Sequence, residues 1–146
     1  MDWDASRESG STESAAQASG RTGSVGVLVV DDSPVFRRGM GRAVRVHGGM
    51  QLVGEADGGE AALAAIQRLR PDVVLLDLRM PDIDGLEVLY RLRDLDPPPA
   101  CRVLIVSASL DEGLEHAARA AGAVGCVSKE LARADICAAA LRVARQ

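Results

Sequence analysis

Short apolar runs alternate with longer amphipathic stretches five times between residues 25 and 145. Most of these runs hold Val, Leu and Ile without polar interruption, which is typical of strands buried on both faces of a parallel sheet. The predicted strands are Val25–Val30, Met50–Ala56, Val73–Leu76, 102–106 and 124–127. Because strands and helices alternate, consecutive strands should be parallel and joined by right-handed crossovers. The pattern predicts an α/β fold with a five-stranded parallel sheet, doubly wound as a (βα)5 sandwich.

Each predicted strand is followed by a predicted helix with recognisable end signals. Ser33 and Pro34 supply an N-cap and a proline at the first helical position, and Asp84 with Glu87 has the spacing of a capping box. The predicted helices cover residues 34 to about 47, 60–69, 84 to about 94, Glu112–Ala121 and about 131 to 145. Helical periodicity predicts that the buried face of the last helix carries Leu131, Ala134, Cys137, Ala138 and Leu141.

The amino-terminal segment differs from the rest of the chain. Residues 1–24 are mostly small and polar and lack an apolar period, so we expect a disordered tail there. The remaining residues, 25–146, fit one domain large enough to bury a substantial core. Nothing in the given sequence is left over for a second domain.

Composition narrows the classes of function. Aromatic residues make up only 2% and the net charge is −4, which argues against a nucleic-acid-binding surface and hence against direct DNA contact. No apolar stretch approaches the length of a membrane span, and the N-terminus lacks a secretion signal. The cysteines, Cys101, Cys126 and Cys137, are odd in number and widely spaced, so we expect reduced, mostly buried thiols in a cytoplasmic protein.

Polar side chains follow four of the predicted strands at the points where they end. They are Asp31 and Asp32, Asp77, Ser107 and Lys129. Because ligands of such sheets bind outside the carboxyl ends of the strands, these groups should meet in one pocket. Three carboxylates brought together repel one another unless a hard cation joins them, and Mg2+ prefers carboxylate, water and phosphate oxygens. Taken alone, the Asp pair could equally be a helix cap or turn former; Asp77 at a second strand end favours the metal.

The same pocket has the groups needed for phosphoryl transfer. Asp77 could attack phosphorus and form an aspartyl phosphate. Such a reaction requires in-line positioning and compensation of negative charge. Mg2+ could supply part of that compensation, Lys129 could act as a point charge, and the Ser107 hydroxyl could donate a hydrogen bond to a phosphoryl oxygen.

Four motifs in order make the chain similar to a known family. They are Val-Val-Asp-Asp-Ser at 29–33, the run from Asp77 to Glu87 with the pattern Asp-x-x-Met-Pro-x-x-x-Gly-x-Glu, Val-Ser-Ala at 106–108 and Val-Ser-Lys at 127–129. From residue 25 onward the chain resembles the response-regulator receiver domain of bacterial two-component systems, and its style resembles the NarL/FixJ-type subfamily. The resemblance implies a flavodoxin-like fold and a phosphorelay switch rather than a metabolic enzyme.

The resemblance also implies a role for each site residue. Asp77 would be the phosphoacceptor, served by a histidine kinase or phosphotransfer protein. Asp32 and Asp77 would bind Mg2+ directly, Asp31 would act mainly through water, and the backbone carbonyl of Arg79 would be a further ligand. Ser107 and Lys129 would contact the phosphoryl oxygens. A homodimer that forms on phosphorylation is a further expectation from the family.

Two positions depart from the family pattern or vary within it. Three residues before Lys129, where receivers usually have Tyr or Phe, this chain has Cys126. A small thiol cannot swing as a ring does, so we hypothesise that phosphorylation propagates by ordering of the loop at Ser107 and Ala108 alone. The Arg79 side chain could hold the phosphoryl oxygens or pair with Asp82 or Asp84, but a solvent-exposed arginine is the simpler interpretation.

The first predicted helix has two further features. Arg38, Arg42 and Arg45 recur at helical spacing and form either a solvated face or a docking stripe for a kinase or phosphotransfer helix. Gly39 and Gly41 each weaken a helix by up to about 1 kcal/mol relative to Ala. Close packing and local mobility both remain open as reasons for them.

Two alternative functions would make other demands on the sequence than the phosphoacceptor switch does. A magnesium-dependent phosphatase with an aspartyl-phosphate intermediate after the first strand would need a second Asp two residues after Asp31, where the chain has Ser33. It would also need an additional cap domain. A transcriptional regulator would need a helix-turn-helix segment, which these residues do not contain, although the chain could be the receiver part of a longer regulator.

Overall fold

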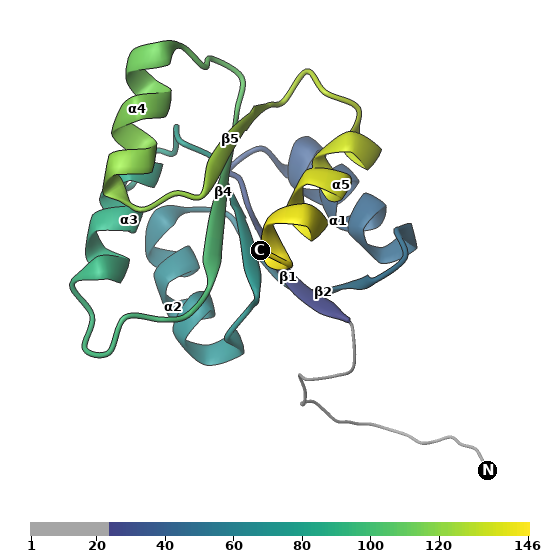
Figure 1. Cartoon of the computed structure of the whole chain (residues 1–146), viewed down its shortest axis with the longest axis horizontal. Helices are drawn as coiled ribbons and strands as arrows, with labels where there is room; N and C mark the ends of the chain where they lie inside the picture. The colour runs from purple at the N-terminus through teal and green to yellow at the C-terminus, as the bar shows by residue number, and fades with distance from the viewer. Residues whose placement is uncertain (1–23) are drawn as a thin grey trace.

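The computed structural model describes residues 24–146, in which five strands alternate with five helices (Figure 1). The predicted disordered tail lies outside the described residues except for Ser24. The strands are β1 (Val25–Val30), β2 (Met50–Ala56), β3 (Val73–Leu76), β4 (Arg102–Ser107) and β5 (Gly125–Ser128). The helices are α1 (Pro34–Val46), α2 (Gly59–Leu69), α3 (Gly85–Arg93), α4 (Glu112–Ala121) and α5 (Arg133–Ala144).

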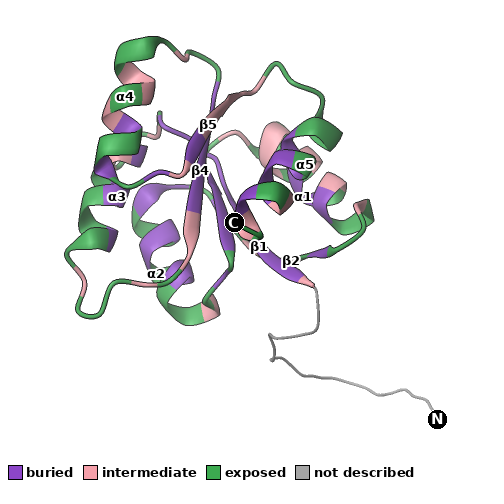
Figure 2. Ribbon diagram, in the orientation of Figure 1, coloured by how far each residue is buried: buried purple, intermediate pink, exposed green. Residues whose placement is uncertain are grey.

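All four strand pairings are parallel, and the sheet order is β2-β1-β3-β4-β5. Helices α2, α3 and α4 cover one face of the sheet, and α1 and α5 cover the other (Figure 1). Each face has its own aliphatic cluster, and Figure 2 shows that the central strands between them are buried. The predicted doubly wound (βα)5 sandwich, with the flavodoxin-like strand order, is confirmed.

The sheet register brings the strand ends that carry the polar residues together. Val30 pairs with Leu76, and Ser107 pairs with Ser128. The Asp77 backbone N–H donates to the Val30 carbonyl oxygen at 3.0 Å, and the Lys129 N–H donates to the Ser107 carbonyl at 2.9 Å. Parallel strands in this register place all the predicted site residues at the carboxyl ends of the strands, on one side of the sheet.

The predicted caps are present, and they fix where α1 and α3 begin. Ser33 Oγ accepts from the Phe36 N–H at 3.3 Å, and Asp84 Oδ1 accepts from the Glu87 N–H at 2.9 Å. Gly85 follows the second cap, and a Cβ there would lie 2.8 Å from the Asp77 carbonyl oxygen. A glycine at this position therefore lets α3 begin directly against the backbone of the predicted phosphoacceptor.

The buried face predicted for α5 is only partly correct: Cys137 is buried as predicted and Leu141 is half-buried, but Ala134 and Ala138 are exposed. Its buried residues are Ile136, Cys137, Ala139, Ala140 and Val143. Leu131 precedes the helix and its side chain is 43% exposed. The error has a physical reason: alanine occurs on every side of α5, so helical periodicity allows two apolar stripes, and the contact with α1 and the sheet selects the one that contains Ile136.

The two glycines of α1 are explained by close packing. A Cβ at Gly39 would lie 2.8 Å from the Arg133 guanidinium carbon, and one at Gly41 would lie 3.0 Å from Glu55 Oε2. Each glycine makes room for a charged side chain from a neighbouring element. Among residues 24–146, no helix is long and apolar enough to cross a membrane.

Candidate functional site

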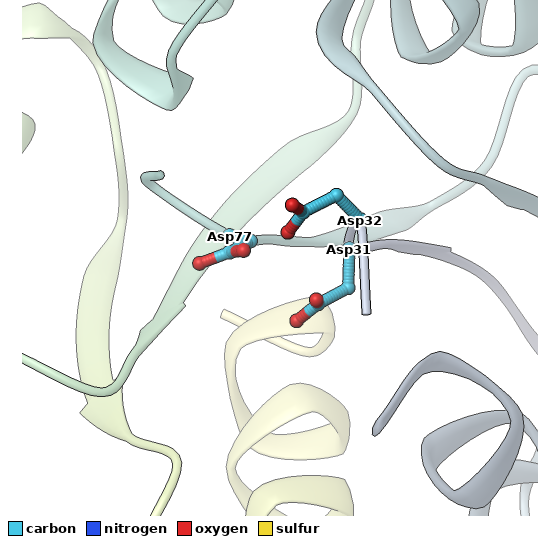
Figure 3. Close-up of side chains that lie close together, drawn as sticks. All are labelled: Asp31, Asp32 and Asp77. Atoms are coloured by element: carbon cyan, nitrogen blue, oxygen red, sulfur yellow. The ribbon is translucent and has the colours of Figure 1, made fainter. Parts of the chain in front are cut away.

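Three carboxylates converge at the carboxyl ends of β1 and β3. Asp31 and Asp32 follow β1 and Asp77 follows β3, and one oxygen from each lies within 4.8 Å of the others. Figure 3 shows the three side chains on these adjacent strand ends. Asp31 and Asp77 are buried, whereas Asp32 is exposed. The predicted acidic pocket therefore exists, and it is open to solvent on the Asp32 side.

Lys129 supplies the positive charge of the pocket. Its Nζ lies 2.6 Å from Asp31 Oδ2 and 3.5 Å from Asp77 Oδ2. The side chain is only 19% exposed, so its ammonium is partly removed from water. The contact is possible because β5 ends one residue before Lys129, beside the end of β4.

Ser107 is the last residue of β4 and is buried. Its hydroxyl oxygen accepts a hydrogen bond from the Ser109 N–H at 3.2 Å. A hydroxyl has one donor and two acceptor positions, so this contact leaves the Ser107 O–H available as a donor. The residue is joined to Lys129 through the backbone bond between β4 and the chain after β5.

Both Asp31 oxygens already have partners within the protein. Oδ1 accepts from the Ser33 N–H at 2.8 Å, and Oδ2 pairs with Lys129. The Asp31 carbonyl accepts from Arg37 Nη1 at 2.8 Å, and Arg37 Nε lies 3.3 Å from Glu55 Oε1. Sequence reasoning missed Arg37; its place in the first turns after the Asp pair is the signal that could have singled it out.

The pKa of the Asp77 carboxyl is raised to about 6. Burial is the largest cause, and the neighbouring Asp31 charge adds to it. Lys129 and the Arg79 N–H, which donates to Asp77 Oδ1 at 3.4 Å, act in the opposite direction without cancelling the rise. The pocket therefore disfavours the ionised form of Asp77, and a positive charge that enters the pocket would stabilise this form.

The two variable positions also have clear placements. The Arg79 side chain is exposed, and the two aspartates considered as its partners accept backbone N–H groups elsewhere: Asp82 from α2 and Asp84 from α3. Cys126 is half-buried against the core on the α4 face, and burial raises its thiol pKa. Of the other thiols, Cys137 is buried and Cys101 half-buried, and all three are free.

The donor set fits a hard divalent cation. Three carboxylates within 4.8 Å provide oxygen ligands, and the exposure of Asp32 leaves room for the waters that Mg2+ retains. The pocket thus combines a carboxylate cluster that could hold a cation with a half-buried lysine and a buried hydroxyl. Such an arrangement can compensate the charge of a phosphoryl group placed next to Asp77.

Comparison with known proteins agrees with this geometry. Residues 27–141 match the model of the response regulator receiver domain family. The chain is 42% identical over 121 residues to the transcriptional regulatory protein NarL of Mycobacterium tuberculosis. That alignment covers 83% of this chain and 55% of the relative, so the chain spans about half of that protein's length.

Two solved structures are similar over most of the chain. The signal receiver domain of NarL from Mycobacterium tuberculosis has a TM-score of 0.79 at 40% identity, covering 85% of this chain and 98% of that one. A chain of the CheX–CheY–BeF3–Mg2+ complex from Borrelia burgdorferi has a TM-score of 0.72 at 30% identity, covering 82% and 88%.

Proposed function

The chain belongs to the response regulator receiver family of two-component signalling, and we propose that residues 25–146 form a phosphoacceptor switch in which Asp77 receives a phosphoryl group from a histidine kinase or phosphotransfer protein. Family membership makes the domain a signalling switch rather than a metabolic enzyme. Asp31 and Asp77 are both buried members of the acidic cluster near the Lys129 ammonium, and one observation favours Asp77 as the phosphoacceptor. The Asp77 oxygens have only long contacts, at 3.5 and 3.4 Å, whereas those of Asp31 are held at 2.6 and 2.8 Å.

Mg2+ is the proposed cofactor. Asp32 and Asp77 would bind it directly, together with the Arg79 carbonyl, and Asp31 would act through water. The contacts of Asp31 support this division, because both of its oxygens are engaged with Ser33 and Lys129. The CheY structure solved with BeF3 and Mg2+ adds support from a relative. When bound, Mg2+ would neutralise negative charge between the carboxylates and the phosphoryl oxygens.

The transfer step follows from the positions of the side chains. An ionised Asp77 oxygen attacks phosphorus as the P–N bond of the donor's phosphohistidine breaks, and the leaving imidazole takes up a proton from solvent. Lys129 pairs with one phosphoryl oxygen and the Ser107 O–H donates to another. To make this bond Ser107 would move toward the phosphoryl oxygens. The Ser109 N–H, which donates to its hydroxyl oxygen, would move with it, so the loop that follows β4 would reorder.

For the output of the switch we propose only a general class. The domain would control a partner, an output domain or its own dimerisation, in the cytoplasm, without contacting DNA or a membrane itself. The chain spans about half of NarL, a transcriptional regulatory protein, and this favours a second candidate: the receiver part of a longer helix-turn-helix regulator. The phosphatase alternative receives no support from the family match.

Intact-protein mass after incubation with a small phosphodonor tests the proposal. With Mg2+ the protein should gain one phosphoryl group, and neither the Mg2+-free sample nor the Asp77→Asn variant should do so. Asp82→Asn is the matched control, since it changes an aspartate five residues away that lies outside the acidic cluster. A gain that persists in Asp77→Asn would overturn the assignment of the phosphoacceptor.

A further inference from the structure

The only lysine of this chain places its ammonium over the ring of the only phenylalanine. Lys129 is the single lysine among 17 basic residues, and Phe36 is one of only three aromatic residues. The Lys129 Nζ lies 4.7 Å from the centroid of the Phe36 ring. This is within the distance at which a cation is attracted to the electron-rich face of an aromatic ring, a cation–π interaction. The contact is not part of the phosphoacceptor chemistry described above.

The Phe36 ring is held from two elements. Its backbone lies in the first turn of α1, where the N–H donates to the Ser33 cap directly after the Asp pair. From α5, the Arg133 guanidinium lies 5.4 Å from the ring centroid. Gly39, one turn further along α1, makes this possible, because a Cβ there would collide with the guanidinium. The ring is therefore placed by the helix cap and by packing between α1 and α5.

The remaining close partners of the Lys129 ammonium are two carboxylates of the acidic cluster. Asp31 lies 2.6 Å from it and would keep this contact, whereas Asp77 lies 3.5 Å from it and would bind the divalent cation directly. A lysine has a flexible four-carbon stem, so a single remaining ion pair with Asp31 would not keep its ammonium directed at Asp77. An aromatic ring is uncharged, does not titrate and does not compete for the metal.

We infer that Phe36 is a positioning residue of the phosphoacceptor site: its ring holds the Lys129 ammonium beside Asp77 while Asp77 itself is bound to the cation. This inference rests on the proposed function, because a positioned ammonium matters only if a phosphoryl group arrives there. Phe36 touches neither phosphorus nor the metal. It acts through Lys129, as a side chain that limits the directions in which the ammonium can point.

The contact itself can be measured without any phosphorylation. In protein labelled with 13C-lysine, the single lysine gives one set of side-chain signals, and the ε-methylene protons should be shifted upfield by the ring current of Phe36. The shift should persist after Mg2+ is added and should vanish in Phe36→Leu. Unshifted signals in the wild-type protein with Mg2+ would overturn the inference.

The role in transfer is tested by changing the ring without changing its size. Because the chain has one phenylalanine, growth on 4-fluoro- or 3,4,5-trifluorophenylalanine alters Phe36 alone and withdraws electron density from the ring face. We expect the rate of Asp77 phosphorylation to fall stepwise with fluorination, and to fall roughly three- to tenfold in Phe36→Leu, equivalent to about 0.7–1.4 kcal/mol. Phe36→Tyr should restore most of the rate.

Tyr90→Leu is the matched control for the loss of a ring. Tyr90 is the other aromatic residue of the described domain, and the Arg93 guanidinium carbon lies 5.2 Å from its ring centroid. It lies on α3, on the opposite face of the sheet from α1 and α5. Its loss should leave the rate unchanged. If wild type is phosphorylated but fluorination has no effect, the inference fails and the proposed function stands. If wild type gains no phosphoryl group, the proposed function fails and the positioning role fails with it.

Discussion

Asp77 and Asp82 lie five residues apart between β3 and α3, yet their surroundings have opposite effects on them. Burial and the charge of Asp31 raise the pKa of Asp77 to about 6. Hydrogen bonds from the Glu60 and Gly59 backbone N–H groups lower the pKa of Asp82 to about 2. The surroundings of Asp77 disfavour its ionised form, whereas those of Asp82 stabilise its ionised form.

This difference separates the proposed phosphoacceptor from a residue with a structural role. Asp82 completes the amino-terminal turn of α2, where Gly58 has no side chain to cap the free N–H groups. Asp77 lacks comparable stabilisation and gains most when positive charge enters the pocket. Both residues belong to the same motif, so motif membership alone does not distinguish their roles.

The largest expected effect concerns phosphorylation. Asp77→Asn should lower the Mg2+-dependent rate by about a hundredfold or more, because the nucleophile is removed. Asp82→Asn should retain the rate within about threefold, since it changes only the helix cap. Time courses of intact-protein mass give both rates. Equal losses in the two variants would remove the distinction between the residues.

The second prediction concerns pH. Mg2+ must compete with the proton for Asp77, so the affinity should fall as the pH drops below about 6, approaching a tenfold loss per pH unit. Titration calorimetry between pH 5 and pH 8 measures this. Asp77→Asn should bind Mg2+ weakly and with a flatter pH profile through this window; a flat profile in the wild type would contradict the raised pKa.

The third prediction concerns stability without metal. Because the pKa of Asp77 is raised on folding, the folded state binds the proton more tightly than the unfolded state. Stability should therefore fall as the pH rises from about 4 to about 6, and the loss should be complete above that window. Asp77→Asn should unfold at higher temperature at pH 8, with a gain on the order of 1 kcal/mol after solvent screening.

Asp82→Asn should shift stability in the other direction. The pKa of Asp82 is lowered on folding, so its contribution is present above about pH 4 and is lost as the pH falls toward about 2. Thermal unfolding at pH 5 and pH 8 in the presence of a chelator measures both variants. If the two substitutions shifted the unfolding temperature in the same direction at pH 8, the comparison would fail.

The smallest expected effect concerns how phosphorylation of Asp77 is transmitted to surfaces outside the pocket. Cys126→Tyr places an aromatic ring three residues before Lys129, and we expect it to strengthen phosphorylation-dependent self-association without altering the rate at Asp77. Sedimentation of phosphorylated and unphosphorylated samples measures this. Unchanged self-association would count against the idea that the thiol weakens transmission.

Most of the fold was predictable because the local signals agree with one another. Apolar runs without polar alternation mark the buried strands, and Ser33 and Asp84 mark helix starts that the structure shows as capped. The clustering of Asp31, Asp32 and Asp77 was also predictable, because parallel strands present their carboxyl ends at one edge. The errors lie where such signals are weak: β5 is shifted by one residue, and the buried face of α5 was predicted correctly only in part.

Residue order along the chain was enough to specify the element sequence, the parallel sheet and the acidic pocket, because hydrophobic periodicity and strand ends are local properties. Contacts between distant segments were decided by packing. The guanidinium of Arg133 over Gly39, the ring of Phe36 under Lys129 and the opposite pKa shifts of Asp77 and Asp82 depend on which elements meet in space. Burial and charge neighbours are set by tertiary structure, and a linear pattern does not contain them.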